Sequence, residues 1–72
     1  MSNYEVELTI NNKVCFYREY CDIDNALTQY YALLFFSQQL DAPVELEIYA
    51  WHDDGNGSSL LHRYSNIVSE RN

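Results

Sequence analysis

The feature that most constrains the fold of this chain is a strict alternation of apolar and polar residues over residues 4–10. The apolar members are Tyr4, Val6, Leu8 and Ile10, and the polar members are Glu5, Glu7 and Thr9. Successive side chains of a β-strand point to opposite faces of the sheet. The segment is therefore predicted to be a half-buried strand whose glutamates face away from the core.

A second run of strand-forming residues, 14–20, follows Asn11, Asn12 and Lys13. A two-residue loop would place Ile10 opposite Lys13 and reverse the faces of one strand, whereas a three-residue loop keeps the apolar faces together. The three-residue loop pairs Ile10 with Val14, Leu8 with Phe16, Val6 with Arg18 and Tyr4 with Tyr20. We therefore predict a hairpin with a loop at residues 11–13, where asparagine tolerates the left-handed conformation that such a loop needs.

Residues 22–25, Asp-Ile-Asp-Asn, are typical of a helix start, because their side chains can cap free N–H groups and their negative charge suits that end of the helix dipole. The helix is predicted to continue to about Leu40 and to end before Pro43. At 100° per residue one face is apolar and should cover the sheet. Its members are Ala26, Leu27, Tyr30, Leu33, Leu34, Ser37 and Leu40.

Tyr31 and Phe35 lie outside this apolar face, and two interpretations stay open for them. They extend the core into a broader stripe, or they form an exposed apolar patch that contacts a second copy of the chain or another partner. A small core would gain stability from such an association, so a homodimer is one possible assembly.

The second half of the chain is predicted to form another hairpin, from a strand at residues 44–52 and a strand at residues 59–65. The residues between them, 53–58, have the composition of a turn. A five-residue loop would place Trp51 opposite Leu61 and Tyr49 opposite Arg63. The predicted fold is therefore α+β, in the order ββαββ, with a single helix on one face of a four-stranded antiparallel sheet. It forms one domain over residues 1–72, with an ordered core at about 4–65 and a tail at 66–72.

Eleven acidic residues against four basic ones give the chain a formal net charge of −7. Direct binding to nucleic acid needs clustered Lys and Arg, and an anionic membrane surface would repel an acidic chain. We therefore expect the protein to bind neither. Because no charged-then-apolar leader pattern and no apolar run near the length of a membrane span is evident, we expect a soluble protein made without export. We expect a cytoplasmic protein.

The sequence predicts neither a metal site nor a cofactor nor catalysis. Cys15 and Cys21 are too far apart on an extended strand to form a disulfide, and they lack the spacing of a zinc site. The loop acids around Asp53 lack the spacing of a calcium loop, and His52 and His62 have no evident third ligand. No pocket-forming element or nucleophile motif accompanies the glutamates. The chain is therefore not expected to be an enzyme.

The outward positions of the predicted strands combine acids with large aromatic side chains. The predicted partner-binding residues are Glu5, Glu7, Glu19, Glu45, Glu47, Tyr17, Tyr49 and Trp51. One interpretation is that the acids serve solubility and discourage pairing between sheet edges. The other is a docking face for a basic partner, in which carboxylates imitate phosphates and aromatic rings anchor the contact.

The acidic charge, the Asp-Ile-Asp-Asn-Ala-Leu helix start at residues 22–27 and the order of elements over residues 4–65 resemble small phage-encoded inhibitors, among them the anti-CRISPR proteins. The resemblance implies a stoichiometric inhibitor that evades antiviral defence in the host cytoplasm. Its acidic surface would occupy the nucleic-acid-binding groove of a basic host protein or nucleoprotein complex. The alternatives are an antitoxin or immunity protein against a basic toxin, and a homo-oligomeric scaffold domain.

Overall fold

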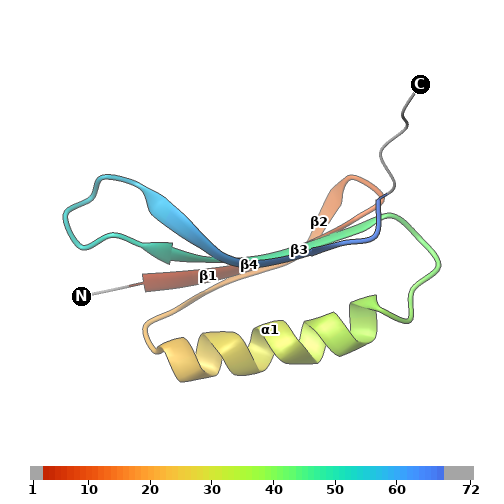
Figure 1. Cartoon of the computed structure of the whole chain (residues 1–72), viewed down its shortest axis with the longest axis horizontal. Coiled ribbons are helices and arrows are strands. Elements are labelled where there is room, and N and C mark those ends of the chain that lie inside the picture. The colour runs from red at the N-terminus through yellow and green to blue at the C-terminus, as the bar shows by residue number, and fades with distance from the viewer. Residues whose placement is uncertain (1–2, 68–72) are drawn as a thin grey trace.

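The computed structural model describes residues 3–67 and confirms the predicted ββαββ order and the α+β fold. One helix lies along one face of a single antiparallel sheet, whose strand order is β2-β1-β3-β4 (Figure 1). The elements are β1 (Asn3–Ile10), β2 (Lys13–Tyr20), α1 (Ile23–Ser37), β3 (Val44–Trp51) and β4 (Ser58–Ser65). Of the predicted tail, residues 68–72 lie outside the described residues.

The turn of the first hairpin differs from the prediction. Asn11 and Asn12 form a two-residue turn with φ angles of 54° and 67°, the left-handed values that hairpin turns of this length require. Ile10 therefore pairs with Lys13 and not with Val14. The predicted three-residue loop and that pair were wrong.

A β-bulge corrects the face reversal that the short turn would otherwise cause. Thr9 pairs with Val14 and Leu8 with Phe16, so Cys15 is the extra residue on β2. A bulge places two residues opposite one and so restores the alternation beyond it. From Leu8–Phe16 to Tyr4–Tyr20 the pairing is as predicted.

The second hairpin also has a different register from the one predicted. Trp51 pairs with Ser58 and Tyr49 with Leu60, while Arg63 lies opposite Glu47. A register shift between Ile48 and Tyr49 accommodates an additional residue on β4. Both predicted pairs, with Leu61 and with Arg63, were therefore wrong.

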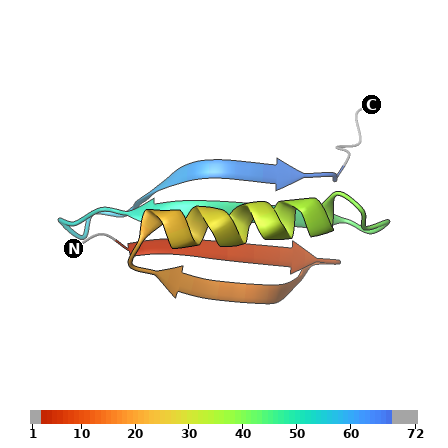
Figure 2. The ribbon, with the colours of Figure 1, turned by 90° about the horizontal axis from the view of Figure 1, so that it is seen from below.

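The helix covers the two central strands, β1 and β3, and leaves β4 beside it rather than beneath it (Figure 2). It ends at Ser37, earlier than the predicted Leu40, and the N–H groups of Gln39 and Leu40 donate to the carbonyls of Phe36 and Ser37 in a tighter final turn. The core consists of Val6, Leu8, Ala26, Tyr30, Val44, Leu46 and Ile48, all nearly inaccessible to solvent. The predicted apolar face is confirmed over the helix, since Leu27, Leu33 and Leu34 pack against this core, and Leu40 packs against it from beyond the end of the helix.

Tyr31 and Phe35 are not part of the core. Their side chains are 51% and 70% exposed. The interpretation as a broader core stripe was therefore wrong, and an exposed apolar patch is what the structure contains.

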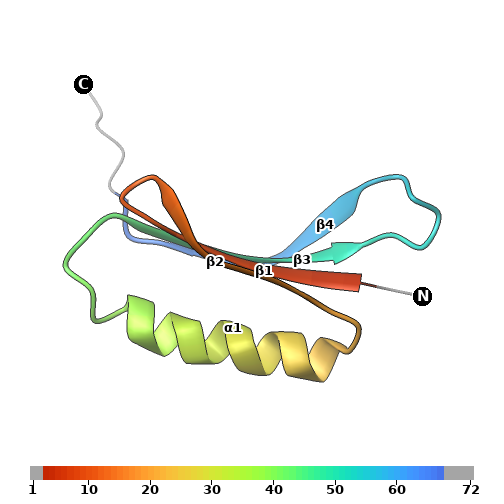
Figure 3. The same ribbon diagram turned by 180° about the vertical axis from the view of Figure 1, so that it is seen from behind.

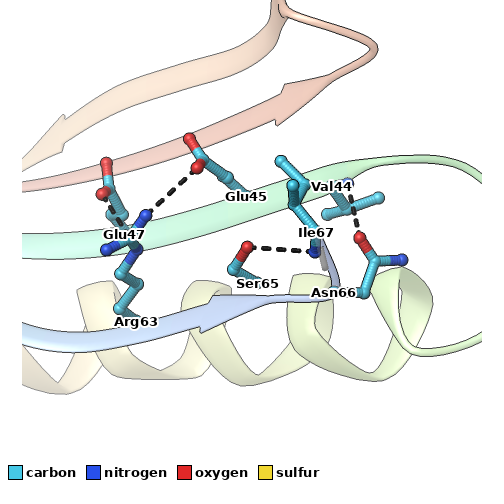
Figure 4. Close-up of polar contacts among 7 residues, drawn as sticks. All are labelled: Val44, Glu45, Glu47, Arg63, Ser65, Asn66 and Ile67. Atoms are coloured by element: carbon cyan, nitrogen blue, oxygen red, sulfur yellow. Dashed lines mark hydrogen bonds and ion pairs between the residues drawn. The ribbon is translucent and has the colours of Figure 1, made fainter. Parts of the chain in front are cut away.

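Asn66 joins the end of β4 to the loop that follows the helix. Its side-chain oxygen accepts a hydrogen bond from the Val44 N–H at 2.8 Å, and its amide nitrogen donates to the Ala42 carbonyl at 2.8 Å (Figure 4 shows the first of these). The ordered chain thus continues past Ser65. Among the described residues, no helix has the length and apolar character needed to cross a membrane.

Candidate partner-binding face

The face of the sheet opposite the helix is uncovered (Figure 3), and we call it the open face. Side chains alternate between the two faces along each strand, and residues directly paired across neighbouring strands point to the same face. Because β1 lies between β2 and β3, the outward acids of three strands are neighbours. All eight predicted partner-binding residues lie on the open face.

The pairing arranges these residues in rows across the sheet. In one row Glu5 lies between Glu19 of β2 and Tyr49 of β3. In the next row Glu7 lies between Tyr17 of β2 and Glu47 of β3. Glu45 and Trp51 extend the pattern at the two ends of β3, opposite Thr9 and Asn3.

Two of these contacts, Glu5–Glu19 and Glu7–Glu47, place like charges directly opposite each other. Such pairs destabilise a sheet, whereas opposite charges at the same positions would stabilise it by up to about 1 kcal/mol. Among residues 3–67, no Lys or Arg forms an ion pair with Glu5, Glu7 or Glu19. The acidic block therefore persists at a cost in stability.

Arg63 offsets this charge at one side of the open face. Its guanidinium lies 3.1 Å from the Glu45 carboxylate and 3.6 Å from that of Glu47 (Figure 4). The arginine side chain is half exposed, so each ion pair contributes little to stability. Its single positive charge offsets one of these two negative charges, so the β4 side of the face is less acidic than the β1 and β2 side.

Tyr17 and Tyr49 act as neutral hydrogen-bond donors among the carboxylates. The Tyr17 hydroxyl donates to the Glu19 carboxylate at 3.1 Å. Hydrogen bonding to Glu5 is the main cause that raises the pKa of Tyr17, followed by burial and by the bond to Glu19. Burial and hydrogen bonding to Glu47 raise the pKa of Tyr49. The hydroxyl groups hold the carboxylates in place without neutralising them.

Exposed apolar area lies beside the acids. Tyr17 is 49% exposed and Trp51 is 40% exposed. Aromatic side chains of this kind supply most of the binding energy in many protein interfaces, because they lose apolar contact with water when a partner covers them. The open face thus combines charge for attraction with rings for contact.

Two exposed apolar residues of the open face were not predicted from the sequence. Leu60 pairs with Tyr49, and Val14 pairs with Thr9; their side chains are 48% and 58% exposed. Both are displaced by bulges from the positions that simple alternation assigns to them. Only the ease with which Asn-Asn forms a two-residue hairpin turn could have indicated the shift at Val14.

The other candidate groups remain separate from one another. Cys15 and Cys21 are free thiols, as expected. His52 Nε2 lies 2.8 Å from the Ser59 hydroxyl, whereas the His62 ring lies against the rings of Tyr30 and Tyr31. Within residues 3–67 no group of three or more His, Cys, Asp or Glu side chains could hold a metal ion.

No protein-family model matches the chain, and neither a curated protein nor a solved structure shows significant similarity to it.

Proposed function

We propose that the protein is a small binding inhibitor, encoded by a phage or another mobile element, whose open face docks on the nucleic-acid-binding groove of a basic host protein or nucleoprotein complex. A CRISPR effector is the leading candidate class. The observation that carries the proposal is the block of Glu5, Glu7, Glu19 and Glu47 across three neighbouring strands.

The geometry of a sheet makes this block a regular array of negative charge. Outward residues recur about every 6.6 Å along a strand and about every 4.8 Å across strands. A protein groove that holds a nucleic-acid backbone contains Lys and Arg side chains at repeated positions. The array attracts such a groove over a distance, so association is fast at low salt and slows steeply as salt is added.

The unfavourable pairs of like charge also support a binding role. Solubility alone would be served by acids placed anywhere on the surface, without opposing each other across strands. A basic partner would neutralise Glu5–Glu19 and Glu7–Glu47 together, so binding would relieve a repulsion that the free protein retains.

The test is capture of proteins from a bacterial lysate on the immobilised chain at low salt, followed by elution in a salt gradient. We expect a nucleic-acid-handling complex that elutes at moderate salt and is displaced by double-stranded DNA, because both ligands would occupy one groove. The double variant Glu5→Lys/Glu7→Lys should lose this complex.

A matched control separates the open face from overall charge. Asp24→Lys/Asp41→Lys changes the net charge by the same amount at exposed positions of the helix start and the following loop. It should retain the complex. Equal loss in both variants, or retention in both, would contradict the proposal. Capture of a small basic toxin would favour an antitoxin, and recovery of only the chain itself would favour a scaffold.

A further inference from the structure

The edge of the sheet formed by β4 has an unusual character for a chain this acidic. The strand has the sequence Ser-Ser-Leu-Leu-His-Arg-Tyr-Ser, which contains no acid, and its single Arg63 is bound to Glu45 and Glu47. Leu60 and Leu61 are 48% and 37% exposed. An exposed edge strand with apolar side chains is a template for pairing with another strand.

The flank of the helix nearest to β4 is also apolar and exposed. The Tyr31 ring lies 6.2 Å from the His62 ring of β4, which shows that this side of α1 faces β4. Phe35 follows Tyr31 by four residues and therefore lies on the same side of the helix. Leu60 points to the opposite side of the sheet, because it pairs with Tyr49 of the open face. Exposed apolar side chains therefore flank the β4 edge on both sides of the sheet, and we call Tyr31, Phe35, Leu60 and Leu61 the β4 strip.

We propose that the β4 strip binds a second copy of this chain, through antiparallel pairing of the two β4 strands, with Tyr31 and Phe35 of each copy packing against the helix-side residues of the partner's β4.

Charge is the reason for assigning a second copy as the occupant. Two molecules of net charge −7 repel each other over most of their surfaces. The β4 strip is the part where they can meet without opposing acids, because its strand is free of acids and Arg63 offsets one of the two charges of the neighbouring Glu45 and Glu47. A basic partner would instead be drawn to the open face. The opposite edge, β2, carries Lys13, Arg18 and Glu19, charges that discourage strand pairing.

The apolar area of the strip is sufficient for a small dimer interface. A fully exposed aromatic side chain offers about 200 Å², so Tyr31, Phe35, Leu60 and Leu61 together expose roughly 400 Å² on each copy. Two copies would thus remove at most about 800 Å² of apolar surface from water, before the paired β4 backbones are counted. Stable interfaces begin at about 1,200 Å² in total, a size that the backbone and the remaining side chains of β4 can supply.

The symmetry of such a dimer follows from the strand pairing. Two antiparallel edge strands are related by a two-fold axis perpendicular to the sheet, so the contact is isologous and closed. Both helices then lie on the same side of one continuous sheet, and the two open faces form one surface on the other side. The proposed dimer contact and the proposed partner contact use different residues. An experiment can therefore contradict one of these proposals without contradicting the other.

The first test is light scattering or sedimentation equilibrium from about 5 µM to about 500 µM, the range in which a weak dimer changes population. We expect the mass to rise from 8.5 kDa towards twice that value. Phe35→Gln should raise the dissociation constant by at least about tenfold, the factor that about 1.4 kcal/mol of lost apolar contact produces.

The adjacent residue provides a matched control. Phe36 is also an exposed aromatic side chain of α1, at 49%. It follows Gln29 by seven residues, and Gln29 accepts a hydrogen bond from Tyr20 of β2, so Phe36 lies on the opposite flank. Phe36→Gln should leave the dissociation constant within about twofold. Equal effects of both variants would overturn the proposal, as would a monomer at every concentration.

A second measurement tests the strand pairing independently of the helix. The β4 amides that point away from β3 should exchange with solvent more slowly at high protein concentration than at low concentration, and β2 edge amides should not. Leu60→Lys should abolish this difference by placing a charge in the paired edge. Concentration-dependent protection on β2 instead of β4 would contradict the proposed interface.

Discussion

The two faces of the sheet are formed by the same strands but have opposite effects on the stability of the fold. Towards the helix, Val6, Leu46 and Ile48 are completely buried and stabilise the fold by apolar contact. Towards solvent, Glu5, Glu7 and Glu47 crowd together and oppose it. Stability is concentrated on one face and binding potential on the other. Substitutions at neighbouring positions of one strand should therefore have different consequences.

The largest expected effect is on the covered face. Leu46→Ala removes a fully buried side chain and leaves a cavity, so it should lower the free energy of unfolding by about 3 kcal/mol. That is a large part of the stability of a domain this small. Its neighbour on the open face provides the comparison: Glu45→Gln should change stability by no more than about 0.5 kcal/mol. Urea unfolding followed by circular dichroism measures both, and similar losses would refute the division between faces.

A second substitution should improve the covered face. The Ser37 hydroxyl is completely buried and has no hydrogen-bond partner among the described residues. Ser37→Ala removes this unsatisfied group and introduces a better helix former, so it should raise the free energy of unfolding by about 1 kcal/mol. A decrease in the urea midpoint would mean that the hydroxyl has a partner in solution.

A smaller gain is expected on the open face. Glu7→Lys places a positive charge opposite Glu47 and should stabilise the protein by about 0.5 kcal/mol. The gain should shrink in about 1 M salt, where screening weakens both the repulsion in the wild type and the attraction in the variant. Urea unfolding at low and high salt checks this. A gain that does not depend on salt would show that charge is not its cause.

The smallest effect concerns alkaline pH. An unfolded tyrosine loses its proton near pH 10.0, whereas the raised pKa of Tyr17 keeps the folded residue neutral. Above pH 10 the unfolded state therefore binds fewer protons, and stability falls as pH rises. The contribution is fully present below pH 10. Tyr17→Phe should make this decline shallower, as measured by urea unfolding at increasing pH, and an unchanged slope would contradict the assigned hydrogen bonding.

The sequence was a good guide to the elements and a poorer guide to the turns. Alternation at Tyr4–Ile10 and the 3.6-residue period of the helix reflect burial, which affects every residue of an element. Six of the eight residues of the candidate face could therefore be named from β1 and β3, whose alternation is unbroken, and Tyr17 and Glu19 from the part of β2 beyond its bulge.

The register of β4, and that of β2 next to its turn, could not be derived in this way, because one additional residue in each strand is absorbed by a bulge. A bulge changes the pairing locally and leaves little trace in composition. The sequence could not decide whether Tyr31 and Phe35 are exposed. Their exposure depends on the position of α1 over β1 and β3, which is set by tertiary packing and not by the local sequence pattern.

The strand order β2-β1-β3-β4 has a consequence for how the chain folds. Each outer strand pairs with its neighbour in the sequence, and such hairpins close within microseconds. The central pair, β1 with β3, joins segments separated by β2 and the whole helix, so its closure carries the larger entropic cost. Folding is therefore expected to be limited by the docking of two preformed hairpins beneath α1. Val6 and Ile48, which face each other across that seam, should control its rate.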